Sequence, residues 1–183
     1  ARPYRFPNSK NPEKLYNNYI KSIASFVKYL AKNGYIVLLI EHTFATTEHE
    51  NDRKALNDII LYLNKNDYTF ISNPEYNCYD LKCVYSFCDY IIGTRFHSMI
   101  FSLSNKIPGI AISYDGNKST GIMRDIGLDK YVVDIYDINY NMLKKMFESI
   151  NENKLYIVNK IEKYLDFINN QRKLLISEME KKR

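Results

Sequence analysis

Short apolar segments alternate with helix-length segments along most of this chain. The clearest is Ile36–Ile40 (IVLLI), a continuous apolar run of the kind that is buried on both faces of a parallel sheet. Strands that are separated by helix-length crossovers are typical of a parallel, doubly wound α/β sheet. The predicted strands are Ile36–Ile40, Tyr68–Ser72, Tyr90–Ile92, Gly109–Ser113 and Tyr131–Val133.

The predicted helices fill the intervals between these strands. Asn11, Pro12 and Glu13 give the first helix a cap candidate, a proline in its first turn and an early acid, and Gly34 ends it. A Rossmann-like domain also needs a strand before its first helix. The segment 1–4 resembles the end of a strand-to-loop transition, so we expect that strand, and a preceding domain, upstream of residue 1. Further helices are predicted near 52–63, 79–87, 96–104, 118–126, 142–150 and 155–179.

We therefore interpret residues 1–183 as one Rossmann-like domain, the C-terminal half of a larger two-domain protein. No linker or internal repeat divides the chain. A long C-terminal helix, within residues 153–181, is expected to pack on the domain or extend from it. One face of this helix carries the apolar residues Ile157, Ile161, Tyr164, Leu165 and Ile168.

The charge of the chain excludes few partners by itself. The net charge is +5, but the basic residues are dispersed and include no zinc-finger spacing, glycine-rich basic arm or RNA-binding aromatic signature. We therefore expect no nucleic-acid partner. Attraction to an acidic polysaccharide or peripheral association with a membrane surface stays open. No apolar run approaches the roughly 18–20 residues that cross a membrane.

The three cysteines are spaced C-x4-C-x4-C. On a helix, Cys78, Cys83 and Cys88 point about 140° apart in succession, so they are not expected to share a metal. An odd number without a Cys-x-x-C pair favours reduced, buried or half-buried thiols in a cytoplasmic protein.

A polar loop follows the strand Ile36–Ile40. His42 and His49 lie in it together with acidic residues, a composition that invites a metal-binding interpretation. The loop shows no recognised ligand pattern, so we expect no metal site. Glu41 follows the strand end directly and is expected to face the cleft and contact substrate.

Arg95, His97 and Lys118 come just after two predicted strands. The carboxyl ends of parallel strands lie on one rim of a sheet, where ligands bind. Two fixed positive charges and an imidazole suit a small, multiply charged anion there. Arg95 has a structural alternative, an ion pair with a nearby acid such as Asp89. Because no glycine-rich phosphate loop occurs, a dinucleotide dehydrogenase and a P-loop kinase are disfavoured.

The segment Gly93–Ser98 (GTRFHS) resembles the G-x-R-x-H signature of the polysaccharide pyruvyl transferase family. The later Ile112–Lys118 (ISYDGNK) is similar to the Ser-Tyr…Lys segment of that family. Gly127-Leu128 and the Arg2-Pro3 turn continue the resemblance, which covers most of residues 1–134.

This resemblance implies a fold of the GT-B type, with two Rossmann-like domains. It also implies a reaction in which pyruvate from phosphoenolpyruvate becomes a cyclic ketal on two hydroxyls of a sugar, with release of phosphate. The acceptor would be a sugar or a lipid-linked oligosaccharide of a cell-wall polymer or exopolysaccharide. We expect a cytoplasmic enzyme, at the inner face of the membrane where its acceptor is lipid-linked, with phosphoenolpyruvate as donor substrate and no cofactor.

The resemblance assigns roles to individual residues. Arg2 and Lys118 would bind the carboxylate and phosphate of the donor, and His97 would be the general acid or base. Arg95 would orient the donor or stabilise the departing phosphate. The remaining substrate-binding candidates are Ser98, Ser113, Tyr114 and Glu41.

Two other functions stay open at this point. One is a nucleotide-sugar glycosyltransferase of the same architecture. The other is a non-catalytic carbohydrate-binding or assembly module. Without its other half, the chain alone could also be inactive.

Overall fold

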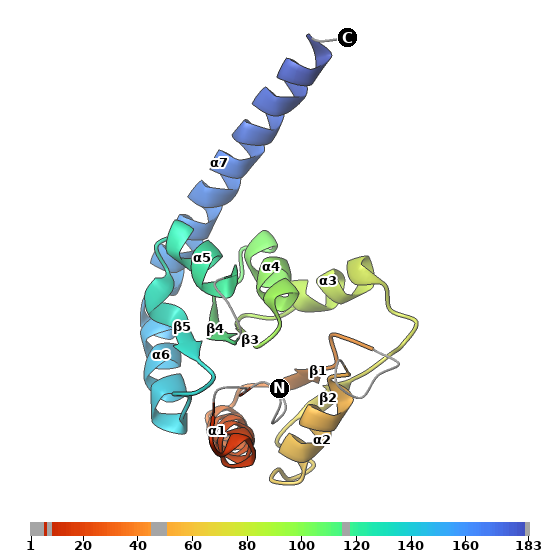
Figure 1. Cartoon of the computed structure of the whole chain (residues 1–183), viewed down its shortest axis with the longest axis vertical. Coiled ribbons are helices and arrows are strands. Elements are labelled where there is room, and N and C mark those ends of the chain that lie inside the picture. Colours follow the sequence, from red (N-terminus) through yellow and green to blue (C-terminus); the bar gives the residue numbers. More distant parts are fainter. Residues whose placement is uncertain (1–5, 7–8, 45–50, 115–117, 182–183) are drawn as a thin grey trace.

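The structure is a computed structural model of the 183-residue chain, and it describes residues 6, 9–44, 51–114 and 118–181. Helices and short strands alternate along it (Figure 1). The strands are β1 (Leu38–Ile40), β2 (Thr69–Ile71), β3 (Ile91–Gly93), β4 (Gly109–Ser113) and β5 (Val132–Asp134). The helices are α1 (Pro12–Lys32), α2 (Arg53–Ile60), α3 (Cys78–Ser86), α4 (Phe96–Ser104), α5 (Lys118–Asp125), α6 (Tyr140–Glu152) and α7 (Lys154–Glu180), with a 3-10 turn at Asp129–Tyr131.

The strands form two parallel sheets. In the first, β1 pairs with β2, and Leu39 lies opposite Phe70. In the second, β4 lies between β3 and β5, with Ile92 opposite Ile110. The predicted parallel α/β architecture with flanking helices is therefore confirmed, and it is Rossmann-like.

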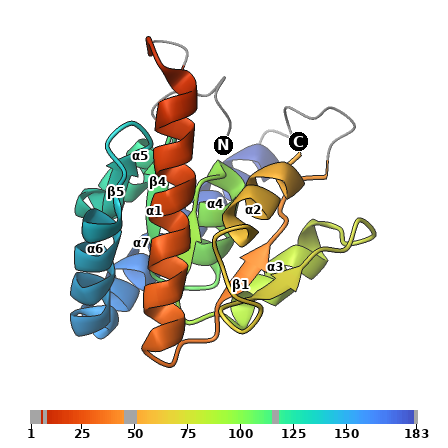
Figure 2. The same cartoon turned by 90° about the horizontal axis from the view of Figure 1, so that it is seen from below.

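The helices cover the sheets from two sides. On one side α1 contacts α2 and α6, and on the other α4 contacts α3 and α5 (Figures 1 and 2). The strand β4 lies between these layers, and its first four residues are buried. This explains its unbroken apolar sequence, since a strand that is covered on both faces exposes no side chain to water.

Local sequence signals mark the ends of α1 and the start of α3. Asn11 caps α1 by accepting a hydrogen bond from the backbone N–H of Lys14, and Pro12 occupies the first turn, as predicted. Gly34, with a φ of +83°, follows the end of α1 in the left-handed region that glycine tolerates. In α3, Asn77 and Asp80 form a reciprocal capping box.

The C-terminal helix α7 extends from the domain (Figure 1). Ile157 and Ile161 are buried, and Tyr164 and Leu165 pack against the core at its edge. Beyond them Ile168 is 43% exposed, so the predicted apolar face is buried only in its first half. None of the helices among the described residues is both long and apolar enough to cross a membrane.

The cysteines differ in part from the expectation of buried or half-buried thiols. All three are free, but Cys78 and Cys83 are exposed and only Cys88 is half-buried. Cys78 and Cys83 lie on α3, whereas Cys88 follows its end, so the helical spacing applies only to the first two. Which side of α3 is exposed was not visible in the spacing. Burial raises the pKa of the Cys88 thiol, with a further contribution from the charge of Asp89.

We expect Gly109→Ala to destabilise the protein. A Cβ on Gly109 would meet the backbone carbonyl oxygen of Ile91 more closely than real Cβ atoms come, so β3 and β4 would have to separate. Overpacking of this kind costs about 1–3 kcal/mol. The matched control is Gly121→Ala in α5, where a Cβ has open space and should stabilise by about 0.5–1 kcal/mol. Urea denaturation measures both; equal effects of the two substitutions would contradict the close approach.

Candidate active site at the carboxyl ends of the strands

Polar side chains follow each of the first four strands. Because the paired strands are parallel, the residues that follow them lie at the carboxyl-end rim of each sheet. These residues are Glu41 and His42 after β1, Ser72 after β2, Thr94 and Arg95 after β3, and Tyr114 after β4.

An ion pair joins Arg95 to Asp52. The Nε and Nη2 atoms of Arg95 donate to Oδ1 of Asp52 at 2.9 and 2.8 Å. The two side chains are 21% and 17% exposed, so water screens the pair only in part. Asp52 lies at the start of α2, and its other carboxylate oxygen accepts from the backbone N–H of Thr43 at 3.0 Å. The pair therefore fixes the guanidinium at the rim.

This pairing corrects the alternative that assigned Arg95 to Asp89. The side chain of Asp89 instead accepts from Lys154 at the start of α7, at 2.8 Å. Asp89 precedes β3 and Arg95 follows it, so the two residues lie at opposite ends of that strand. Proximity in sequence was misleading because β3 lies between Asp89 and Arg95 and holds them apart.

His42 lies half-buried beside two aromatic rings. Its Nδ1 is 3.2 Å from the hydroxyl of Tyr85, and its ring packs against those of Tyr85 and Phe101. Burial lowers the pKa of His42; the carboxylate of Asp52 opposes this shift, while the positive charges of Arg95 and His97 add to it. Burial also raises the pKa of Tyr85. Both shifts favour the neutral forms of these side chains.

Tyr19 and Ser98 make further polar contacts near Arg95. The hydroxyls of Tyr19 and Thr94 are 2.9 Å apart, and burial raises the pKa of Tyr19 to about 12. Ser98 lies in the first turn of α4 and donates to the backbone carbonyl of Arg95 at 2.6 Å. This bond shapes the turn that carries the arginine.

Glu41 is buried and holds two segments together. One of its carboxylate oxygens accepts from Arg53 at 2.9 Å and from the Ser72 hydroxyl at 2.6 Å. Glu41 thus joins the ends of β1 and β2 to the start of α2. It is absent from the residues that line the adjacent cavity, so the substrate contact predicted for it stays a prediction.

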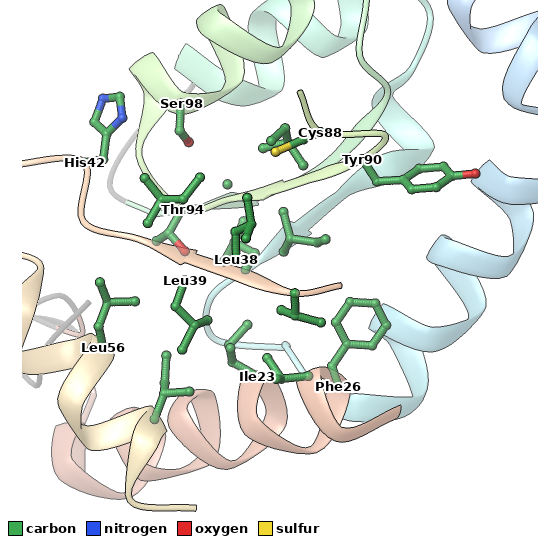
Figure 3. A pocket seen from close by; sticks show the side chains of 18 of the residues that line it. Ile23, Phe26, Leu38, Leu39, His42, Leu56, Cys88, Tyr90, Thr94 and Ser98 are labelled. Carbon is green, nitrogen blue, oxygen red and sulfur yellow. The ribbon is translucent and has the colours of Figure 1, made fainter. Parts of the chain in front are cut away.

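A cavity of about 590 Å³ opens beside these residues (Figure 3). It runs between β1 and β3, and much of its wall is apolar. Polar groups gather where the two strands end. They are His42, Asn51, Asp52, Thr94, Arg95, Ser98 and Tyr114.

The structure brings only some of the predicted site residues together. Arg95, Ser98 and Tyr114 line the cavity. His97 is exposed in the first turn of α4, and Lys118 is exposed at the start of α5. Neither belongs to the cavity wall.

Ser113, another predicted residue, is not among the described residues that line the cavity. Ser113 ends β4, and its carbonyl accepts from the backbone N–H of Ile135 at 2.9 Å. Arg2 lies outside the described residues, as does His49.

Asp52, Tyr85 and Thr94 line the cavity but were not predicted from the sequence. Asp52 had a detectable signal, because it precedes a helix that follows a strand, the usual place for residues at the rim. Tyr85 is one of 17 tyrosines and had no distinguishing signal. Among the described residues, no group of three or more His, Cys, Asp or Glu could hold a metal ion.

Comparison with known proteins identifies the family of the chain. The sequence matches the family described as polysaccharide pyruvyl transferase over residues 2–116. That range includes Arg95 and His97 and ends just before Lys118. The chain belongs to the polysaccharide pyruvyl transferase family.

A curated relative places similar sequence in polysaccharide synthesis. The chain is 28% identical over 121 residues to the amylovoran biosynthesis protein AmsJ of Erwinia amylovora. The matched region covers 66% of this chain and 29% of that relative, so the chain spans under a third of its length. No solved structure matches the chain significantly.

We expect His42 to make stability depend on pH. An unfolded imidazole has a pKa of about 6.5, and burial lowers the pKa of folded His42. Below about pH 6.5 the unfolded chain therefore binds more protons, and the free energy of unfolding falls as the pH decreases toward the folded pKa. His42→Gln should make this decrease shallower between pH 7.5 and 5.5 in urea denaturation.

His97→Gln is the matched control for His42→Gln. It removes the same ionisable group from an exposed position in α4. If both substitutions flatten the pH dependence equally, burial of His42 is not its cause.

Proposed function

We propose that the domain is part of an enzyme that transfers pyruvate from phosphoenolpyruvate to two hydroxyls of a sugar during exopolysaccharide biosynthesis. Family membership supports the transferase class. The similarity to AmsJ, an amylovoran biosynthesis protein, supports the polysaccharide context. The acceptor is a sugar or a lipid-linked oligosaccharide presented at the cytoplasmic face of the membrane.

The reaction balances without an added oxidant or reductant. The methylene carbon of phosphoenolpyruvate gains a proton and becomes a methyl group. Two sugar oxygens form bonds to the central carbon, and the bond from that carbon to the phosphate oxygen breaks. The two hydroxyl protons end on the methyl carbon and on the released phosphate. Positive charge develops on the central carbon beside the departing phosphate, so fixed charges in the site influence the rate strongly.

The observation that carries this proposal is the position of Arg95. It belongs to the GTRFH segment, follows β3 and lies at the polar end of the cavity. A guanidinium binds carboxylate or phosphate through paired N–H donors. We assign Arg95 to the donor anion and Asp52 to its orientation, since the carboxylate holds the guanidinium at 2.8–2.9 Å.

His97 and Lys118 supply the remaining chemistry in this proposal. His97 exchanges the proton with the methylene carbon or with an attacking hydroxyl. Lys118 and Arg2 bind the carboxylate and the phosphate as further cations. Exposure of His97 and Lys118 suits groups that meet a substrate between this domain and another part of the protein.

The reaction itself is tested with the protein expressed from its complete coding sequence. Phosphoenolpyruvate is supplied with a lipid-linked oligosaccharide fraction from the producing organism. Acceptor-dependent phosphate release and a ketal methyl signal in the product NMR spectrum are expected. Consumption of UDP-glucose without phosphoenolpyruvate turnover would indicate a glycosyltransferase and overturn the proposal. Turnover of neither donor would indicate a non-catalytic module.

We expect Arg95→Gln to lower kcat/KM for phosphoenolpyruvate by about 100-fold, because it removes a charged donor at the developing negative charge. Arg172→Gln is the matched control. It makes the same charge change in the exposed part of α7, away from the rim, and should stay within about twofold of the unaltered enzyme. Equal losses would mean that total charge, and not the rim site, determines turnover.

A further inference from the structure

The cavity separates two sheets that would otherwise be neighbours. In the described part of the chain, β1 and β3 share no backbone hydrogen bond, although each is paired on its other side. The cavity lies between them (Figure 3). Ile23 and Phe26 of α1 line one face, and Tyr85 and Ser98 of α3 and α4 line the opposite face.

The edge of β1 that faces away from β2 directs backbone N–H and C=O groups toward this cavity. The carbonyl of Val37 accepts from Thr69 at 2.8 Å, and the N–H of Glu41 donates to Ile71 at 2.9 Å. Backbone groups of successive strand residues point alternately to the two sides of a strand. Leu38 and Ile40 therefore direct their N–H and C=O groups away from β2, and both residues line the cavity.

The facing edge belongs to β3. The N–H of Ile91 donates to the carbonyl of Pro108 at 3.1 Å, in register with the pairing of Ile91 and Gly93 to β4. By the same alternation, Ile92 directs its backbone groups away from β4. Ile92 also lines the cavity, so polypeptide edges with hydrogen-bonding capacity border it on two sides.

Among the described strands, the order leaves one position of the classic sheet without a strand. The sheets run β2-β1 and β3-β4-β5, and the classic doubly wound order is 3-2-1-4-5-6. If β1 and β2 are strands 2 and 3, and β3, β4 and β5 are strands 4, 5 and 6, then strand 1 falls between β1 and β3. Strand 1 in that order immediately precedes the helix that corresponds to α1.

The beginning of α1 lies at the correct end of the sheets. Phe6, shortly before α1, is buried against Tyr136, which follows β5. In α1, Tyr19 reaches Thr94, which follows β3. The polypeptide thus enters α1 from the carboxyl-end rim. A strand that ends at this rim and leads into α1 runs parallel to β1 and β3.

We propose that a β-strand from polypeptide upstream of residue 1 occupies the cavity. This strand pairs with β1 and β3 and joins the two sheets into one six-stranded parallel sheet. Its side chains are apolar and pack between α1 on one face and α3 and α4 on the other. The relative AmsJ, of which the match covers only 29%, carries ample chain for such a segment.

The cavity walls favour a strand over a small molecule. A volume of 590 Å³ would also accommodate a small ligand. A ligand would leave the backbone groups of Leu38, Ile40 and Ile92 without regular partners, whereas an added strand pairs them along their length. Ile36, in the most apolar run of the chain, is 87% exposed beside this cavity, as expected for a residue whose neighbouring strand is lacking.

Amide hydrogen exchange by NMR tests the proposal in the protein expressed from its complete coding sequence. Ile91 and Ile92 form an internal control, because the Ile91 N–H donates to the carbonyl of Pro108, just before β4, whereas the Ile92 N–H points away from β4. With the strand in place, Ile92 and Ile40 should exchange as slowly as Ile91, about 100-fold or more slower than unpaired amides. Cross-strand NOEs should join Ile92 to a residue upstream of residue 1.

Alternating protection, with Ile91 slow and Ile92 fast, would overturn the proposal, as would NOEs from Ile92 to a small molecule only. The readout does not use enzymatic activity. The strand can therefore fail while the pyruvyl transfer holds, and the reverse outcome is equally distinguishable.

Discussion

Side-chain contacts join the two sheets at the rim, in addition to the apolar core that they share, and no backbone hydrogen bond between the sheets is found in the described residues. These contacts join segments that follow β1, or lie in α1, to segments around β3. They are the Arg95–Asp52 ion pair, the contact of His42 with Tyr85 and the contact of Tyr19 with Thr94. The candidate site is therefore also the place where the two parts of the domain meet, so substitutions there affect geometry as well as chemistry.

The ion pair also limits what Arg95 can do alone. Asp52 cancels much of the positive charge of the guanidinium at a distance, while it fixes the direction of the N–H groups. In the proposed reaction, attraction of a multiply charged donor must then come from other basic side chains. Lys118 and His97, which are exposed near the strand ends, are the candidates for this role. Orientation and attraction would then be separate tasks of different side chains.

Much of the fold could be predicted because its signals are local. The bounds of β4 and α4 agree with the sequence prediction. A buried strand is continuously apolar, which makes β4 recognisable in the sequence. The prediction for Ile36–Ile40 was too long: only Leu38–Ile40 forms a strand. Ile36 is apolar, yet it is exposed to solvent in the described part of the chain. Its apolar side chain suits a buried strand of the kind predicted from the sequence.

The site was harder to predict because its partners are distant in sequence. Arg95 bonds to Asp52, 43 residues away, and the nearby Asp89 bonds to α7 instead. Glu41 follows a strand as expected, yet its carboxylate accepts hydrogen bonds from Arg53 and Ser72. Rim position can be predicted from strand ends. The direction of a side chain at the rim depends on which helix packs beside it, and this is a tertiary property.

The order of the strands connects the cavity with the candidate site. Ligands of open parallel sheets bind where the strand order reverses, beyond the carboxyl ends. In this domain that point lies between the place proposed for the added strand and β3, and Arg95 follows β3. The strand would fill the apolar length of the cavity and leave only its polar end open. The part left open would then be the polar end lined by Arg95, Thr94 and Tyr114, where the proposed donor anion would bind.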